Sequence, residues 1–218
     1  MKKNSNTYKL AVCAIMVALG AVLSLVKVVQ MPFGGSVTLL SMLPCAMVSV
    51  MLGLKWGLAA SFVESVIQLA FGITMDGVLG WGLTPAMLIG TILLDYILAY
   101  TVIGLAGAFR SKGYVGICVG TGLAVFLRFV CHLISGAVIF ANLEQFVAFG
   151  ASWVGRPWLY SLCYNGAYML PELVITMVAA TILFRLPQIR RIMANETVLA
   201  ASGEYFRKPP ACRGLFFA

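Results

Sequence analysis

The fold of this chain is decided by two neighbouring stretches, RFVCHLISGAVIF at residues 128–140 and RPWLYSLCYNGAYMLPE at residues 156–172. Each predicts an apolar helix that carries polar side chains, among them His132 on the first and Asn165 and Glu172 on the second. A charged side chain at the centre of a bilayer costs roughly 2.5–3.5 kcal/mol, so such residues usually face a bundle interior or a cavity. We therefore expect two membrane-spanning helices that share a small-molecule site.

The composition of the whole chain indicates a membrane protein. Its 218 residues are 61% hydrophobic and 10% charged, whereas soluble domains are about 45–50% apolar and about 25% charged. In a soluble protein the net charge of +8 would favour nucleic acid or lipid as a partner. In a membrane protein the positions of the charges matter more, and we expect membrane lipid and no nucleic acid as a partner.

Six segments are apolar enough to span a membrane, which takes about 20 residues. They lie at 8–29, 36–53, 57–74, 86–109, 114–141 and 158–185. If the N-terminus is cytoplasmic, twelve Lys and Arg residues fall on the inner side and only Arg156 falls in an outer loop. This distribution follows the positive-inside rule and supports an even number of spans. We therefore expect an all-α, six-transmembrane-helix bundle at 1–187 in the plasma membrane, both termini cytoplasmic, with a basic tail at 188–218.

The first apolar segment follows a basic start, as a secretory signal peptide does, but it continues to Val29, beyond the apolar core of a signal. We interpret it as an uncleaved helix. Ala14 and Ala18 lie one turn apart on it, and small residues four apart let another helix approach closely. By spacing alone, packing inside the bundle and docking of a partner subunit are equally open, and Gly116 and Gly120 repeat the spacing.

Two acidic residues lie inside the predicted spans. Asp95 is deep in its segment, where a carboxylate is costly unless it meets a cation, a hydrogen-bond donor or water. We interpret Asp95 as a functional residue. Glu64 is either functional or paired with a basic residue such as Lys27 or Arg128.

Several chemistries are excluded by the motifs that the sequence lacks. It contains no G-x-x-x-x-G-K-[ST] phosphate loop, no H-E-x-x-H and no G-x-S-x-G. The six cysteines show no C-x-x-C spacing, and five of them lie in apolar segments, where we interpret them as small buried residues. We therefore expect no enzyme activity, no metal site and no cofactor.

Four segments together carry a resemblance to a known family. They read PFGGSVTLLSMLP (32–44), LLDYILAYTVIGLAGAF (93–109), LRFVCHLISGAVIF (127–140) and YSLCYNGAYMLPE (160–172). In order and spacing the chain resembles the thiamine-specific substrate-binding (S) components of energy-coupling factor (ECF) transporters, over almost its whole length to about Pro187. The resemblance implies high-affinity capture of thiamine and docking on an ECF module of one transmembrane coupling subunit and two ATPases, which would drive uptake.

The resemblance also implies roles for individual residues. Ala14 and Ala18 match the small-residue motif that docks on the coupling subunit. The substrate contacts that match are Asp95 with Tyr96 beside it, His132, Tyr160 and Asn165. Thiamine carries a cationic thiazolium and an aminopyrimidine, and a carboxylate, aromatic faces and amide or imidazole groups suit both rings.

The chain departs from the family pattern at three aromatic or acidic positions. Gly35 and Leu39 stand where some members have Trp and Glu, and Phe140 stands where some have Trp. The segment GITMDGVLGWGLTP (72–85) is longer than expected, so we expect Trp81 to replace a lost aromatic contact; Trp153 and Trp158 are further candidates.

Three other functions stay open at this point. The chain could be an S component for another vitamin or a thiamine precursor. It could be a membrane scaffold whose polar residues only hold helices together, or a carrier that needs no ATPase partner.

Overall fold

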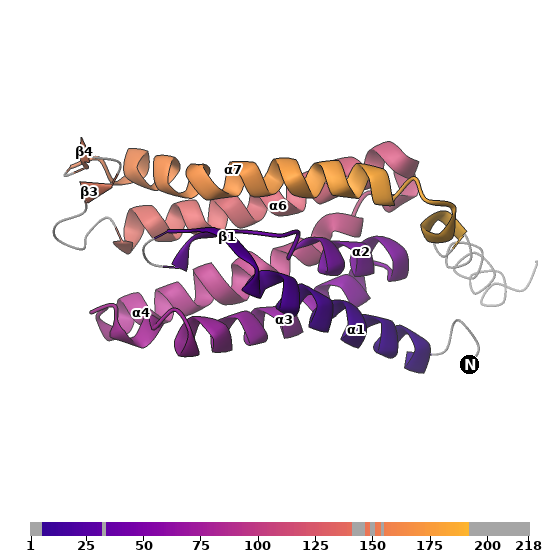
Figure 1. The fold of residues 1–218 in the computed structure, drawn as a ribbon, viewed down its shortest axis with the longest axis horizontal. Coiled ribbons are helices and arrows are strands. Elements are labelled where there is room, and N and C mark those ends of the chain that lie inside the picture. The colour runs from indigo at the N-terminus through magenta and orange to yellow at the C-terminus, as the bar shows by residue number, and fades with distance from the viewer. Residues whose placement is uncertain (1–5, 32–33, 141–146, 149–150, 154, 192–218) are drawn as a thin grey trace, which may run out of the picture.

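The computed structural model describes residues 6–31, 34–140, 147–148, 151–153 and 155–191, and most of this chain is helical. The helices lie side by side along the long axis of the molecule (Figure 1). They are α1 (Asn6–Leu25), α2 (Leu43–Leu52), α3 (Leu54–Thr74), α4 (Pro85–Thr91), α5 (Ala99–Thr101), α6 (Gly113–Val138) and α7 (Pro157–Leu183). Shorter helical turns are η2 (Val78–Gly80), η3 (Ile92–Leu98), η4 (Val102–Gly107) and η5 (Arg110–Lys112). The strands are β1 (Lys27–Gln30), β2 (Ser36–Thr38), β3 (Val147–Ala148) and β4 (Ala151–Ser152).

The stretch from Pro85 to Val138 forms two antiparallel arms. It is helical over 54 residues, and one straight helix of that length would reach about 81 Å, far beyond a bilayer. A turn before α6 reverses the chain, and there Gly113 adopts the positive φ of 70° that glycine tolerates best. As a result α6 packs back against η3, α5 and η4. The two arms match the predicted segments 86–109 and 114–141.

The predicted span 36–53 is wrong in its first half. Residues Ser36–Thr38 form strand β2, which pairs antiparallel with β1, and only Leu43–Leu52 is helical. The predicted first helix likewise ends at Leu25 rather than Val29. The physical reason is local: β-branched Val26, Val28 and Val29 favour a strand, and the Gly34–Gly35 pair allows the chain to turn back.

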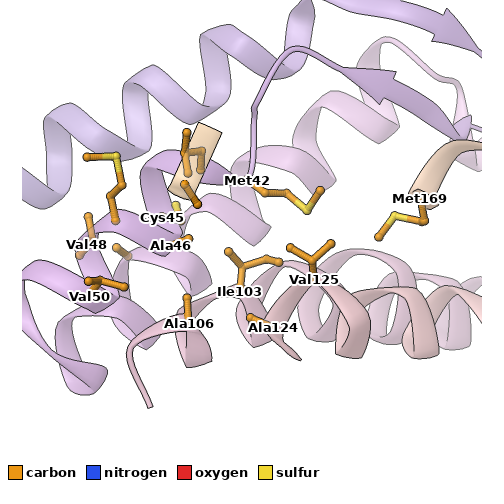
Figure 2. Packing of buried hydrophobic residues seen from close by; sticks show 14 of the residues in the cluster. Met42, Cys45, Ala46, Val48, Val50, Ile103, Ala106, Ala124, Val125 and Met169 are labelled. Carbon is orange, nitrogen blue, oxygen red and sulfur yellow. The ribbon is translucent and has the colours of Figure 1, made fainter. Parts of the chain in front are cut away.

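Helix α2 forms the centre of the molecule. All ten of its residues are buried, and at about 15 Å it is too short to cross a bilayer alone. Figure 2 shows its side chains packed against the two arms and α7. The labelled core residues are Met42, Cys45, Ala46, Val48, Val50, Ile103, Ala106, Ala124, Val125 and Met169.

The helices around α2 touch through small residues. A Cβ added to Gly104 would lie 2.7 Å from backbone atoms of Gly57, and one added to Gly107 would lie 2.3 Å from the carbonyl oxygen of Ser49. Ser49 Oγ also accepts a hydrogen bond from the backbone N–H of Gly107, at 2.9 Å. These backbones approach so closely because no side chain separates them.

Several basic side chains gather at this glycine-packed end of the bundle. Arg110 donates to the carbonyl of Val50, and Arg185 donates to the Tyr114 hydroxyl. Figure 1 shows the start of α1 and the end of α7 at the same end of the molecule. The clustering agrees with the charge pattern of the sequence, and the cytoplasmic position of this end stays a prediction.

The outer surface of the bundle is apolar, as contact with lipid requires. Large apolar side chains lie exposed on several helices, for example Ile15 on α1, Val115 on α6 and Val174 on α7. The cysteines Cys13, Cys45 and Cys131 are buried, as predicted, whereas Cys163 is exposed; all four are free.

Candidate functional site

A cavity opens at the end of the bundle opposite the basic residues. Its walls come from the β1–β2 hairpin, the segment after α3, the arm that includes η3, and helices α6 and α7. All eight residues predicted to bind a substrate line it. They are Gly35, Trp81, Asp95, Tyr96, His132, Phe140, Tyr160 and Asn165. The fold therefore brings the predicted site together, and binding of a ligand by these residues stays a prediction.

Asp95 lies in the middle of η3, a π-helical stretch of seven residues inside the arm. Such wide turns are frequent at functional sites. Asp95 Oδ1 lies 2.8 Å from Nδ1 of His132, and Oδ2 accepts a hydrogen bond from the Ser135 hydroxyl. The carboxylate is thus held by two side chains of α6.

His132 connects Asp95 to a buried arginine. A carboxylate only accepts hydrogen bonds, so the short contact assigns a proton to Nδ1 of His132. Nε2 then accepts a hydrogen bond from Nε of Arg128, at 3.3 Å. The guanidinium of Arg128 stacks on the ring of Tyr100, 4.0 Å from its centroid. Asp95, His132 and Arg128 form one chain of contacts that we call the polar triad.

Glu64, which the sequence suggested as a counter-ion for Arg128, and the buried Glu172 both form hydrogen bonds with other residues. Glu64 accepts a hydrogen bond from Gln68, at 2.8 Å. Glu172 accepts hydrogen bonds from the backbone N–H of Thr38, at 2.6 Å, and from its hydroxyl. Arg128 instead lines the cavity. The sequence did not predict this position, because helical spacing shows which face of α6 carries Arg128 but not which elements pack against that face.

Helix α7 contributes an amide and three tyrosines to the cavity wall. Asn165 Nδ2 donates to the carbonyl of His132, at 3.1 Å, and its Oδ1 accepts from the Tyr168 hydroxyl, at 2.7 Å. The rings of Tyr160, Tyr164 and Tyr168 follow one another with centroids 5.7 and 5.9 Å apart. Asn165 therefore ties α7 to α6 while the tyrosines offer aromatic surface.

The hairpin reaches into the site through a glycine. A Cβ added to Gly35 would lie 2.9 Å from the Tyr164 hydroxyl and equally close to the ring of Tyr168. The Trp found here in some family members could not fit this backbone without a shift. Leu39, the other departure, is 45% exposed and is not among the residues that line the cavity.

Four cavity-lining residues lie just beyond the end of a helix, and we call this part of the cavity its mouth. They are Lys27, Asp76, Trp81 and Phe140. Lys27 Nζ forms an ion pair with Asp76 Oδ1, at 2.6 Å. Trp81 donates from Nε1 to the Asp76 carbonyl and packs edge-on against Phe140, with centroids 5.9 Å apart. Trp81 thus places an aromatic ring at the cavity, and its contact with a ligand stays a prediction. The Lys27–Asp76 pair could not be predicted, because nothing local in the sequence relates two residues 49 positions apart.

The other tryptophan candidates lie elsewhere. Trp153 packs 6.4 Å from the ring of Tyr160, and Trp158 is 56% exposed. Neither is among the cavity-lining residues.

Ala14 and Ala18 lie on the outside of the bundle. Both are exposed and border an apolar groove between α1 and α3, whose other wall includes Trp56 and Val63. The same spacing in α6 has the opposite environment, since a Cβ on Gly120 would lie 2.3 Å from the carbonyl oxygen of Ala106. One spacing thus serves an exposed groove in α1 and internal packing in α6.

The cavity offers a carboxylate, an imidazole, an amide and several aromatic faces in one enclosure. These groups suit a flat heteroaromatic molecule with positive charge. Within the described ranges, no group of three or more His, Cys, Asp or Glu side chains could hold a metal ion.

Comparison with known proteins identifies the family. The model of the thiamine transporter protein family matches residues 10–190. The chain belongs to this family. A relative, the thiamine transporter ThiT of Bacillus subtilis (strain 168), is 32% identical over 199 residues, which cover 84% of this chain and 94% of ThiT. A solved structure of ThiT from Listeria monocytogenes shares the fold with a TM-score of 0.62 at 20% identity, covering 85% of this chain and 98% of that chain.

Family membership confirms several predictions made from the sequence. The chain is a helical, multi-pass protein of the plasma membrane, and its family consists of transporters rather than enzymes. The resemblance to thiamine transport proteins is confirmed at the level of the family.

Proposed function

We propose that this chain captures thiamine with high affinity at the outer side of the membrane and delivers it for uptake driven by an ECF module. The observation that carries the proposal is the polar triad inside an aromatic cavity. In this cavity the carboxylate of Asp95 lies in the same wall as Tyr96 and Tyr164. Membership of a thiamine transporter family supports thiamine as the substrate.

The chemistry of the cavity matches both rings of thiamine. A thiazolium cation is stabilised by carboxylates and by aromatic faces such as those of Trp81 and Phe140 at the mouth. An aminopyrimidine both donates and accepts hydrogen bonds, which suits the carboxylate of Asp95 and the donors around it. A high affinity then follows from a largely preformed site, since few groups must be ordered on binding.

The energy for uptake has to come from a partner. The sequence has no phosphate loop for ATP hydrolysis. The exposed groove beside Ala14 and Ala18 is apolar, and its small residues would let a helix approach closely. We propose this groove as the docking surface for the coupling subunit, which would be bound to two ATPases.

The first experiment is a titration of the purified protein with thiamine and then riboflavin, followed by tryptophan fluorescence. Trp81 lines the cavity, so saturable quenching by thiamine is expected, with strong weakening in Asp95→Asn and His132→Ala variants that still fold. A response to another vitamin but not to thiamine would refute the substrate. Silence to every ligand, checked by calorimetry, would favour a scaffold role.

The second experiment measures thiamine uptake into vesicles with and without an ECF module. Ala14→Trp should abolish uptake and leave thiamine binding unchanged, because it fills the groove and not the cavity. Ile15→Trp is the matched control, since the neighbouring Ile15 is 67% exposed and is not among the groove residues. Uptake in vesicles that lack the module would show a self-sufficient carrier and refute the coupling.

A further inference from the structure

The basic end of the bundle carries positive charge without acidic side chains beside it. In the part of the chain that the structure describes, every acidic residue lines the cavity at the opposite end or accepts hydrogen bonds inside the bundle. These residues are Asp76, Asp95, Glu64 and Glu172. The exposed cations Lys112 and Arg185 at the basic end therefore have no carboxylate partner within the described ranges.

Arg185 is held against the start of α6. Its Nε donates to the Tyr114 hydroxyl, at 3.1 Å, and its guanidinium lies 5.2 Å from the centroid of the Tyr114 ring. The same hydroxyl donates to the carbonyl of Thr181 on α7, at 2.9 Å. Among the described residues Arg185 donates only from Nε. Its terminal nitrogens are therefore available to an anion, which a guanidinium can bind through two parallel N–H groups.

The start of α6 adds to the positive potential of these side chains. The helix is 26 residues long, its first turn contains no acidic residue, and no side chain caps it. Lys112 immediately precedes the helix, with Nζ 5.4 Å from the ring centroid of Phe109. The N-terminus of a helix favours an anion and disfavours a cation. Because Lys112 and Arg185 both lie at this N-terminus, an anion placed there would be stabilised by all three groups.

Exposed apolar side chains continue from this cluster along both helices. Val115 and Val119 on α6, and Val178 and Ile182 on α7, are each more than half exposed. The residues of each pair are four apart, so they share one face of their helix. The two helices pack side by side (Figure 1). The surface therefore combines a cationic end with apolar faces beside it.

We propose that Lys112, Arg185 and the start of α6 bind the phosphate of an anionic phospholipid, whose acyl chains lie along the exposed apolar faces of α6 and α7. We call these three groups the headgroup site. The site lies at the end of the bundle opposite the cavity, and its occupation does not depend on thiamine as the substrate. A lipid held there would fix the depth of this end at the membrane surface.

A lipid fits the headgroup site better than a soluble anion does. Tyr114 has an aromatic ring with a polar tip, which is typical of the membrane–water interface, and its hydroxyl bonds to Arg185. This places the cations at the depth of lipid headgroups. Inorganic phosphate would gain the charge contacts alone, whereas a phospholipid also covers the apolar faces of α6 and α7.

The headgroup site is separate from the groove proposed for the coupling subunit. That groove lies between α1 and α3, and α1 packs on α2 and α3. Figure 1 shows α1 and α7 on opposite sides of the molecule. Docking of a partner in the groove would therefore leave the headgroup site open to lipid.

Native mass spectrometry of the detergent-purified full chain tests the proposal by counting bound lipids during a titration with phosphatidylglycerol. Phosphatidylcholine with the same acyl chains is the neutral comparison and should bind at least about fivefold more weakly. Arg185→Gln should weaken phosphatidylglycerol binding about fivefold, and Lys112→Gln/Arg185→Gln about 20- to 30-fold, since each cation near a membrane surface contributes about a factor of five. The matched control is Lys55→Gln, which removes the same charge from an exposed side chain on α3 at the same end and should stay within about twofold.

Tyr114→Phe provides a second variant that keeps every charge and serves if the double variant does not fold. It removes only the hydroxyl that holds Arg185 and should weaken phosphatidylglycerol binding about threefold. Equal weakening by Lys55→Gln and Arg185→Gln would overturn the proposal in favour of a diffuse surface potential. Equal affinity for phosphatidylcholine would also overturn it. Displacement of the lipid by millimolar inorganic phosphate would overturn it by assigning the site to a soluble anion.

Discussion

The two ends of this bundle are built from the same helices in opposite ways. At the basic end, Gly104 and Gly107 of η4 bring helix backbones into direct contact. At the other end, the arm that contains η4 carries Asp95, and α6 carries His132 and Arg128, around a cavity. The comparison teaches that the same helices can pack backbone to backbone at one end and surround a polar cavity at the other.

This comparison predicts that a substitution at the glycine-packed end lowers stability, whereas loss of the Asp95 charge at the cavity end lowers binding first. The first two predictions below test that separation. The last two concern contacts of the β1–β2 hairpin, and all four are given in order of expected effect.

Gly104→Ala should cause the largest change, a loss of about 3 kcal/mol in the free energy of unfolding. Its Cβ would lie 2.7 Å from the backbone of Gly57 and Leu58, which cannot rotate away. Thermal unfolding in detergent measures this. Gly166→Ala is the matched control, because its Cβ would meet only Leu170, at 4.0 Å. There the better helix propensity of alanine should leave stability unchanged or slightly higher; equal losses at both sites would contradict the comparison.

Asp95→Asn should weaken thiamine binding about 100-fold, or about 2.7 kcal/mol. The amide keeps the shape but loses the negative charge that accepts hydrogen bonds from the aminopyrimidine of the proposed ligand and from His132 and Ser135. Calorimetric titration gives the affinity. Glu64→Gln makes the same change at a buried carboxylate that is not among the cavity-lining residues, and its affinity should stay within about threefold of wild type. A similar loss in both variants would mean that the carboxylates act through the fold.

Thr38→Val should lower the free energy of unfolding by about 1–2 kcal/mol, because buried Glu172 loses the hydroxyl that bonds to it. The backbone N–H of Thr38 remains as a partner, which limits the loss. Chemical or thermal unfolding of the detergent-solubilised protein measures it. Thr74→Val, at an exposed threonine that bonds only within its own helix, should change stability by less than about 0.5 kcal/mol.

Lys27→Met should have the smallest effect on stability, about 0.5–1 kcal/mol, because the pair with Asp76 is partly exposed. High salt should reduce the difference between the variant and the wild type. The double variant Lys27→Met with Asp76→Asn should cost no more than the single one. An additive loss would show that the two residues act independently at the mouth.

Much of the site could be predicted from the sequence because membrane burial makes polar residues informative. A carboxylate and an imidazole inside apolar segments, Asp95 and His132, have few stable environments other than a shared cavity. The cavity-lining positions of Asp95, His132 and Asn165 agree with that reasoning, which depends only on which residues are polar and how deep they lie.

The predictions of helix ends are wrong where a segment is apolar enough for a membrane helix but its residues favour a strand. Hydropathy alone extended the first helix to Val29 and began the second at residue 36, whereas the chain forms the β1–β2 hairpin there. The hairpin is stabilised by contacts distant in sequence, such as Thr38 to Glu172 across 134 positions. No local pattern reports such a contact.

The sequence by itself determined that this is an apolar helical bundle and which residues are costly in a membrane, because those properties depend on composition and spacing. Only the tertiary structure decided the partners of the buried charges. Arg128 could have met Glu64 or Glu172 by charge alone, yet it contacts His132 and Tyr100. Helix packing decides this, since it fixes which of several compatible groups come within hydrogen-bonding distance.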